Sequence, residues 1–347
     1  MIADDDTLLE VDGLRTVFDT RDGAVCAVDG VDVTVRRGEC LGVVGESGSG
    51  KSVTFSSVMG LVRSPGRIAS GTIRFDGRDL RTLTQKQMRA IRGRDIAMTM
   101  QDALTALNPA LTVGEQIAEM LEAHDETLPA GRGRRQKAIR DKSVEMLGLV
   151  GIPSAADRLS QYPHEFSGGM RQRIMIAIAL ASRPKLLVAD EPTTALDVTI
   201  QAQILDLLIE LQKERGMGLI LITHDMGVVA ETAERVQVQY AGQKVEEQNV
   251  RALFRDPHHP YTQALLSALP ERATRHGRLP SIPGVVPGQG DRPPGCQFEP
   301  RCRYATERCR EGVARQGAEH GLALCNYPLA DGVPTGHPEH APAEAGQ

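Results

Sequence analysis

The 347-residue sequence lacks features that several classes of protein require. It contains no tryptophan, and aromatic residues make up only 3% of it. Its 40 basic residues are balanced by 45 acidic ones, which leaves a formal net charge of −5. Proteins that bind nucleic acid use a basic surface, and those that bind single strands add exposed aromatic rings. The composition therefore predicts no nucleic-acid partner.

Long apolar runs and an export signal are also missing. The most apolar stretches, such as IMIAIALA from Ile174 and GLILIT from Gly218, are far shorter than the roughly 20 residues of a membrane-spanning helix. The first residues, MIADDDTLLE, are acidic and do not resemble a signal peptide. We therefore expect a soluble, cytoplasmic chain, in which clustered cysteines are more often metal ligands than disulfides.

The order of apolar patterns predicts an α/β fold with a helical insertion. Residues 7–100 hold strand-like runs divided by glycines, 103–182 show apolar residues at helical spacing, and 185–245 alternate between strand and helix. This order is typical of a mostly parallel sheet. Of the 20 prolines, 11 lie from Pro270 onward, and we expect 331–347 to be disordered because few apolar residues offset the entropy lost on ordering.

The most specific motif is GESGSGKS, which follows the apolar run CLGVV and precedes a helix expected to begin near Lys51. This context is that of a nucleotide-binding phosphate loop. The glycines let backbone N–H groups surround the β-phosphate, Lys51 reaches the β- and γ-phosphates, and the Ser52 hydroxyl is a ligand for Mg²⁺. The alternative is a glycine-serine turn that ends in Lys-Ser by chance. The residues assigned to ATP are Gly45, Ser47, Gly48, Ser49, Gly50, Lys51 and Ser52.

A pair of carboxylates follows the apolar run LLVA. We expect Asp190 to bind Mg²⁺ through water and Glu191 to polarise the water that attacks the γ-phosphate. Acidic residues are also common in turns after strands. The presence of the phosphate loop favours the functional interpretation.

Two further motifs resemble those of ABC-type ATPases: Ser167-Gly168-Gly169 at the start of an apolar helix, and Asp197 in TTALD. A serine and two glycines that open a helix present free N–H groups and the positive end of the helix dipole to a phosphate. The resemblance covers residues 8–330. It implies a P-loop, RecA-like core (1–102 and 183–250) with an antiparallel β subdomain, a helical subdomain (103–182), and a small cysteine-rich, loop-rich C-terminal region (251–330).

The resemblance implies three more site residues. Gln101 corresponds to the glutamine that senses Mg²⁺ and water and touches the membrane partner. His224 corresponds to the histidine near the γ-phosphate, and Phe18, 27 residues before Gly45, is placed like the ring that stacks on adenine. Taken singly, such residues are more often structural. The sequence departs from the usual family pattern at Ala103 (proline), Phe166 (leucine) and Met170 (glutamine).

Several longer stretches, including VVGESGSGKSV, FRDPHHPYTQALLSALP and PPGCQFEPRCRYATERC, resemble the ATP-binding subunits of bacterial dipeptide and oligopeptide importers. That branch implies a second homologous ATPase, which completes each ATP site with its Ser-Gly-Gly. It also implies two membrane permeases, an extracytoplasmic peptide-binding protein and a peripheral place on the cytoplasmic face of the inner membrane. The alternatives are nickel as the solute, or an ABC-type ATPase that acts on DNA or the ribosome.

The last feature is a group of four cysteines, spaced by five, six and fifteen residues: Cys296, Cys302, Cys309 and Cys325. We expect them to ligate one metal centre that folds the proline-rich region, because a structural metal contributes on the order of 10 kcal/mol to folding. Four thiolates suit either Zn²⁺ or a [4Fe–4S] cluster, and gaps wider than those of usual zinc sites favour the cluster. Four unligated thiols remain the alternative. Cys26 and Cys40 are expected in the core.

Overall fold

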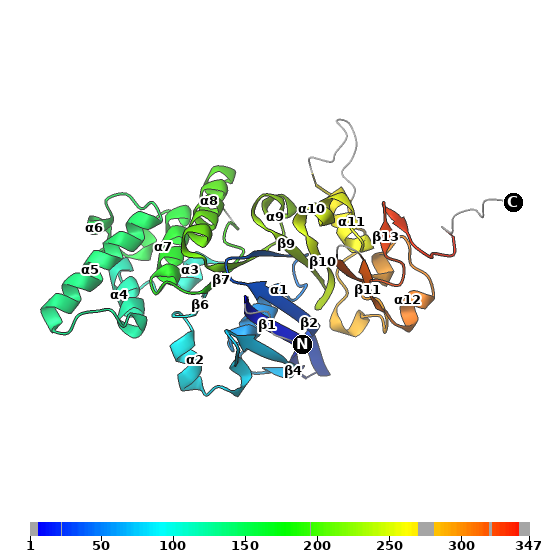
Figure 1. The fold of residues 1–347 in the computed structure, drawn as a ribbon, viewed down its shortest axis with the longest axis horizontal. Helices are drawn as coiled ribbons and strands as arrows, with labels where there is room; N and C mark the ends of the chain where they lie inside the picture. Colours follow the sequence, from blue (N-terminus) through cyan, green and yellow to red (C-terminus); the bar gives the residue numbers. More distant parts are fainter. Residues whose placement is uncertain (1–5, 22, 195, 270–280, 319–320, 340–347) are drawn as a thin grey trace. The chain divides into compact units, whose positions relative to one another are not determined.

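The computed structural model describes residues 6–21, 23–194, 196–269, 281–318 and 321–339 (Figure 1). The chain divides into two compact units, each made of segments that are far apart in the sequence. Unit 1 comprises Met1–Leu9, Thr34–Cys40 and Arg74–Ile222. Unit 2 comprises Glu10–Val33, Leu41–Ile73 and Thr223–Gln347.

Parallel strands form the centre of unit 1. Strand β7 (Leu186–Asp190) pairs in parallel with β6 (Ile96–Thr99) and with β8 (Gly218–Thr223). Every residue of β7 and β8 is buried, as expected of continuous apolar strands that are covered on both faces. The carboxyl ends of β6 and β7 lie side by side, because Thr99 is opposite Ala189. This edge carries two carboxylates, that of Asp190 at the end of β7 and that of Glu191, which follows it.

The helices of unit 1 lie largely where the sequence showed helical spacing. Helices α4, α5 and α7 pack against one another, and α3 packs on α7. A capping box starts α4: the Thr112 hydroxyl accepts from the backbone N–H of Glu115, whose carboxylate accepts from the N–H of Thr112. The helices and 3₁₀ turns are η1 (Leu80–Thr82), α2 (Gln85–Ile91), α3 (Ala103–Ala106), α4 (Val113–His124), α5 (Arg132–Leu149), α6 (Ala155–Arg158), η2 (Pro163–Glu165), α7 (Gly168–Leu180) and α8 (Val198–Arg215).

Unit 2 contains strands of two sheets. In one, β1 (Thr7–Thr20) lies between β2 (Gly23–Arg36) and β4 (Gly66–Phe75). Within unit 1, the end of β4 at Arg74 and Phe75 pairs antiparallel with β5 (Arg78–Asp79). In the other, β3 (Cys40–Val44) pairs in parallel with β9 (Arg235–Tyr240), and β9 pairs antiparallel with β10 (Gln243–Asn249). The C-terminal region joins this sheet, because β10 also pairs with β12 (Gly321–Leu324), which pairs with β11 (Arg315–Ala318).

The remaining elements of unit 2 are short. They are α1 (Lys51–Val58), α9 (Met226–Thr232), α10 (Val250–Arg255), α11 (Pro260–Ser267), η4 (Gln289–Asp291), η5 (Glu299–Arg301), α12 (Arg308–Glu311), β13 (Leu329–Ala330) and β14 (Val333–Pro334). No helix in the described ranges is long and apolar enough to cross a membrane.

Residues 331–339, which were expected to be disordered, are ordered in the structure. Strand β14 pairs with β13, and His337 is 3% exposed with its ring edge-on to that of Tyr327, 5.0 Å between centroids. The aromatic partners that bury this segment lie upstream of it, so its own composition did not indicate them. Residues 340–347 lie outside the described residues.

Candidate functional site

The phosphate loop connects β3 to α1, which begins at Lys51 as predicted. The Lys51 ammonium donates to the carbonyl oxygens of Gly45 (2.7 Å) and Glu46 (3.0 Å), and lies 3.4 Å from the Ser49 hydroxyl. The loop's own backbone therefore holds its lysine. Gly50, which precedes the helix, has no side chain to cap the first N–H groups of α1, and these groups and the helix dipole favour an anion.

Two glycines in this loop are required by close backbone contacts. Gly45 has φ +152°, and a Cβ at this position would lie 2.1 Å from the carbonyl oxygen of Gln239. Gly50 has φ +95°, and its Cβ would lie 2.6 Å from the carbonyl oxygen of Ala27. A side chain at either position would collide with backbone atoms. The two glycines therefore let the loop pack directly against the backbones of β9 and β2.

Unit 1 brings together Glu191 and Gln101, which were predicted separately. Glu191 follows the 4%-exposed Asp190 and has φ +46°, a strained backbone conformation for a residue with a side chain. Its Oε2 accepts hydrogen bonds from Gln101 Nε2 and from the Thr194 hydroxyl, both at 2.8 Å. Its backbone N–H donates to the carbonyl oxygen of Ile222 at 2.9 Å. The carboxylate is thus fixed at the end of β7.

The Ser-Gly-Gly motif and Asp197 open two helices of unit 1. The Ser167 hydroxyl accepts from the N–H of Met170 at 3.4 Å and caps α7, whereas Asp197 accepts from the N–H of Ile200 at 3.0 Å and caps α8. A Cβ on Gly169 would lie 2.8 Å from Ile200 Cγ2, so the glycine allows the two helix starts to approach closely. Ser167 and Asp197 are exposed and accessible to a ligand or a partner.

His224 and Phe18 belong to unit 2. His224 is exposed directly after β8, and the next residue, Asp225, caps α9 by accepting from the N–H of Gly227 at 2.8 Å. Phe18 is half-buried in β1, and its ring lies against Gly66. Their roles at the γ-phosphate and adenine stay predictions. It also stays a prediction that the phosphate loop of unit 2 and the carboxylates of unit 1 act on the same ATP.

One contact of the phosphate loop, with the C-terminal region, was not predicted from the sequence. Arg301 Nη1 and Nη2 donate to Glu46 Oε2 and Oε1 at 2.7 and 3.0 Å, and the N–H of Glu46 donates to the Tyr261 hydroxyl at 2.9 Å. Arg301 stands between Cys296 and Cys302 in the sequence. Nothing in the sequence around Arg301 indicates that it pairs with a carboxylate 255 residues away.

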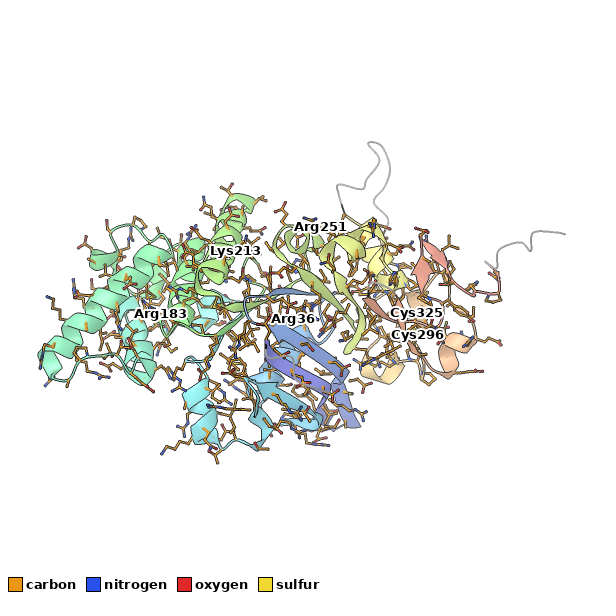
Figure 2. All side chains as sticks on the ribbon, viewed as in Figure 1. Arg36, Arg183, Lys213, Arg251, Cys296 and Cys325 are labelled. Carbon is orange, nitrogen blue, oxygen red and sulfur yellow. The ribbon has the colours of Figure 1, made fainter. Side chains whose placement is uncertain are left out.

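All six cysteines lie in described segments, and none forms a disulfide. Cys26 and Cys40 are buried in β2 and β3, as predicted for core residues. The other four line one small cavity together with aromatic side chains: Cys296, Cys302, Cys309, Cys325, His259, Phe298, Tyr304 and Tyr327. Figure 2 labels Cys296 and Cys325 at this place.

The environment of three of these thiols favours their neutral form. Burial raises the pKa of Cys296 to about 11 and the pKa values of Cys302 and Cys325 to about 12, and neighbouring thiols of the group add to the rise. Within the described ranges, no group of three or more His, Cys, Asp or Glu side chains is arranged to hold a metal ion. The predicted iron–sulfur or zinc centre is therefore not supported as a preformed metal-ion site.

Two stretches of the chain match known protein families. Residues 28–194 match the family described as ABC transporter, and 245–309 match the oligopeptide/dipeptide transporter, C-terminal region. The sequence is 51% identical over 331 residues to the dipeptide transport ATP-binding protein DppD of Escherichia coli (strain K12), which covers 94% of this chain and 99% of that protein. It is 55% identical over 304 residues to DppD of Haemophilus influenzae, covering 88% and 90%. The oligopeptide transport ATP-binding protein AppD of Bacillus subtilis (strain 168) is 48% identical, covering 87% and 90%.

Two solved structures with a similar fold cover about seven tenths of this chain. The dimeric ATP-binding cassette MJ0796, in a post-hydrolysis state bound to ADP and Pi, superposes with a TM-score of 0.62 at 26% identity and covers 70% of this chain and 99% of its own. CbiO1 from Clostridium perfringens, part of the ABC transporter complex cbiONQ, has a TM-score of 0.60 at 28% identity, covering 72% and 91%.

Proposed function

The chain belongs to the family of ATP-binding subunits of dipeptide and oligopeptide ABC transporters, and we propose that it hydrolyses ATP to power the import of short peptides. It has the fold of an ABC-type ATPase, as the sequence predicted. The observation that carries the proposal is the identity of 48–55% to peptide-transport relatives over most of the chain, including the C-terminal match at 245–309. That match favours a transport subunit over an ATPase that acts on DNA or the ribosome.

The roles proposed for the site residues follow from their chemistry. Lys51 and the N-terminal N–H groups of α1 bind the phosphates of ATP, because both present positive charge at the loop. Mg²⁺, for which Ser52, Asp190 and Gln101 are the proposed residues, would neutralise charge on the phosphates. Glu191 orients the attacking water and accepts its proton. Its bonds to Gln101 and Thr194 support this role, since they fix the direction of the carboxylate.

A second homologous ATPase completes each site in this proposal. Ser167, Gly168 and Gly169 present the exposed start of α7 to the nucleotide of the partner. The similarity to a cassette whose structure is dimeric supports the pairing. We place the pair on the cytoplasmic face of the inner membrane, bound to two permeases that receive peptides from an extracytoplasmic binding protein.

Reconstitution tests this proposal. The chain is purified alone and with the co-purifying ATPase and permeases, and ATP turnover is compared in the two preparations. We expect turnover mainly in the complex, together with uptake of di- and oligopeptides into vesicles. Equal turnover in both would contradict the composite site. Uptake of Ni²⁺ without peptides would favour the nickel alternative, and salt-dependent binding to DNA or ribosomes would favour the remaining one.

We also infer that the four clustered cysteines hold a [4Fe–4S] cluster, with Zn²⁺ as the alternative. Their common cavity supports one shared centre. A single zinc ion bonds sulfur at about 2.3 Å and draws all four sulfurs together, whereas a cluster binds each thiolate to a different iron. The gaps between the four cysteines are wider than those of usual zinc sites, which favours the cluster. Bound metal would stabilise the thiolates that burial disfavours.

Anaerobic purification followed by iron, sulfide and zinc analysis separates these outcomes. About four irons with labile sulfide support the cluster. One zinc supports the alternative. A folded C-terminal region with neither metal would contradict both.

A further inference from the structure

The contact between Arg301 and Glu46 joins the cysteine-containing segment to the phosphate loop within unit 2. The Arg301 side chain is 4% exposed, whereas that of Glu46 is 31% exposed. Both carboxylate oxygens of Glu46 accept from the guanidinium, in the bidentate form that is the strongest and most directional ion pair available to arginine.

Two other donors of Arg301 are also engaged. Its Nε donates to the carbonyl oxygen of Pro283 at 2.7 Å, and its Nη1 approaches the Tyr240 hydroxyl at 3.3 Å. The hydrogen bond to Glu46 raises the pKa of Arg301, which favours the charged guanidinium. An arginine held on several sides has little freedom, and it restricts the freedom of its partner Glu46.

Glu46 in turn contacts the lysine of the loop. Its carbonyl oxygen accepts from the Lys51 ammonium at 3.0 Å, and its N–H donates to the Tyr261 hydroxyl of α11 at 2.9 Å. Both the side chain and the backbone of this one loop residue are therefore held by the C-terminal region. A shift of Glu46 would move the carbonyl group that positions Lys51.

The position of Arg301 depends on the fold around the cysteines. In η5, the N–H of Arg301 donates to the carbonyl oxygen of Phe298 at 3.0 Å, and the N–H of Cys302 donates to that of Glu299 at 3.1 Å. Phe298 lines the four-cysteine cavity, and its ring lies 5.3 Å from that of Tyr261. The residues that surround the thiols and those that hold Glu46 thus form one packed group.

We propose that Arg301 is a positioning residue for ATP binding, and that through Glu46 it couples the four-cysteine segment to the phosphate loop. With Arg301 in place, the loop and Lys51 are held ready for the phosphates. When the cysteine segment rearranges, Glu46 is released and the affinity for ATP falls. The inference rests on the proposed function in one respect, that Gly45 to Ser52 bind ATP.

Equilibrium binding of a fluorescent ATP analogue to the full chain tests the coupling. Arg301→Gln and Glu46→Gln are each expected to raise the Kd about tenfold, because each leaves a charged partner without its ion pair. The double variant is expected to bind no more weakly than either single variant, since both changes break the same contact. Arg303→Gln is the matched control, because this exposed arginine of the same motif bonds Gln263 and not the loop.

A positioning role also predicts a split in the kinetics of the assembled transporter. KM for ATP should rise in Arg301→Gln while kcat stays within about twofold, since Arg301 contacts no reacting group. If this variant does not fold, Arg301→Lys serves instead, because lysine keeps the positive charge but cannot form the bidentate hydrogen bonds. Its Kd for the ATP analogue should lie between the wild-type and Glu46→Gln values. An unchanged Kd in folded variants, or additive losses in the double variant, would overturn the inference.

Cysteine variants test the second half of the coupling. Cys302→Ser is expected to raise the Kd for the ATP analogue, and adding Arg301→Gln should cause no further loss. Cys26→Ala, a buried cysteine of β2, is the control and should bind ATP normally. An unchanged Kd in folded Cys302→Ser would overturn the coupling. Lys51→Ala separates the two proposals. If this variant binds ATP normally, the assignment of the phosphate loop fails. If it loses ATP binding while the Arg301 and Glu46 variants bind normally, the Arg301 inference fails.

Discussion

The side-chain amide of Gln101 donates a 2.8 Å hydrogen bond to the carboxylate of Glu191, although 90 residues separate the two in sequence. The parallel pairing of β6 with β7 brings the ends of these strands together, and each residue follows one of those ends. The bond is exposed, so it can exchange with water or with a ligand. A movement of the segment after β6 would therefore shift or break the hydrogen bond that holds the Glu191 carboxylate, the group proposed to activate water.

The first prediction concerns this bond. Gln101→Ala should lower ATP turnover of the assembled transporter about three- to tenfold, because one hydrogen bond that orients Glu191 is lost. The affinity for ATP should change little, since the phosphate loop is untouched. Gln136→Ala, on the exposed side of α5, removes an amide that has no place in the site and serves as the control. Turnover equal to that of the control would contradict a role for Gln101.

The second prediction separates binding from hydrolysis. Glu191→Gln keeps an oxygen that can accept from Gln101 and Thr194, so the local structure should persist. It removes the proton acceptor, and hydrolysis should fall at least about 100-fold while ATP still binds. Single-turnover hydrolysis and filter binding of ATP measure the two quantities. Glu210→Gln on the exposed face of α8 is the matched change, and a similar rate in both variants would contradict the assignment.

The sequence indicated the parts of the site whose function depends on local backbone geometry. A phosphate loop needs a strand, glycines and a helix start in continuous sequence, and the structure has β3, the loop and α1 in that order. Ser167 could be placed at a helix start for the same reason, because its glycines and the apolar helix follow it directly, and it caps α7. The cap that Asp197 forms on α8 was not predicted.

Contacts between distant segments could not be predicted in this way. Arg301 and Glu46 are 255 residues apart, and nothing in GESGSGKS requires a guanidinium at its glutamate. By contrast, the gathering of the four cysteines was predicted from the sequence, and they line one cavity with residues of α11 and η5. Order in 331–339 was missed because His337 is buried by tyrosines from earlier in the chain.

The third prediction distinguishes the capping role of Ser167 from its proposed role toward a partner's nucleotide. Aspartate caps helices as well as serine does, so Ser167→Asp should leave the unfolding free energy within about 0.5 kcal/mol. In the assembled transporter, the added negative charge would face the phosphates, and turnover should fall at least about tenfold. Thr84→Asp makes a comparable change at the cap of α2 and should leave turnover unchanged. Full activity of Ser167→Asp in the complex would contradict the composite site.

The fourth prediction contrasts two glycines of the phosphate loop. A Cβ at Gly45 would lie 2.1 Å from the Gln239 carbonyl oxygen, whereas a Cβ at Gly48 would meet nothing within 4 Å, although φ is positive at both. Gly48→Ala should therefore cost only the backbone strain of about 1–2 kcal/mol. Gly45→Ala must also displace β9 or the loop, and should cost more than about 3 kcal/mol.

Urea unfolding without nucleotide measures both costs on the same scale. Leaving nucleotide out matters, because a methyl group at the exposed Gly48 could obstruct the ligand and so alter the apparent stability through binding. The comparison has a definite sign: Gly45→Ala has the lower midpoint if the loop is seated against the Gln239 carbonyl. Equal midpoints would mean that the loop can move away from β9 at little cost, which would contradict the tight seating of the phosphate loop.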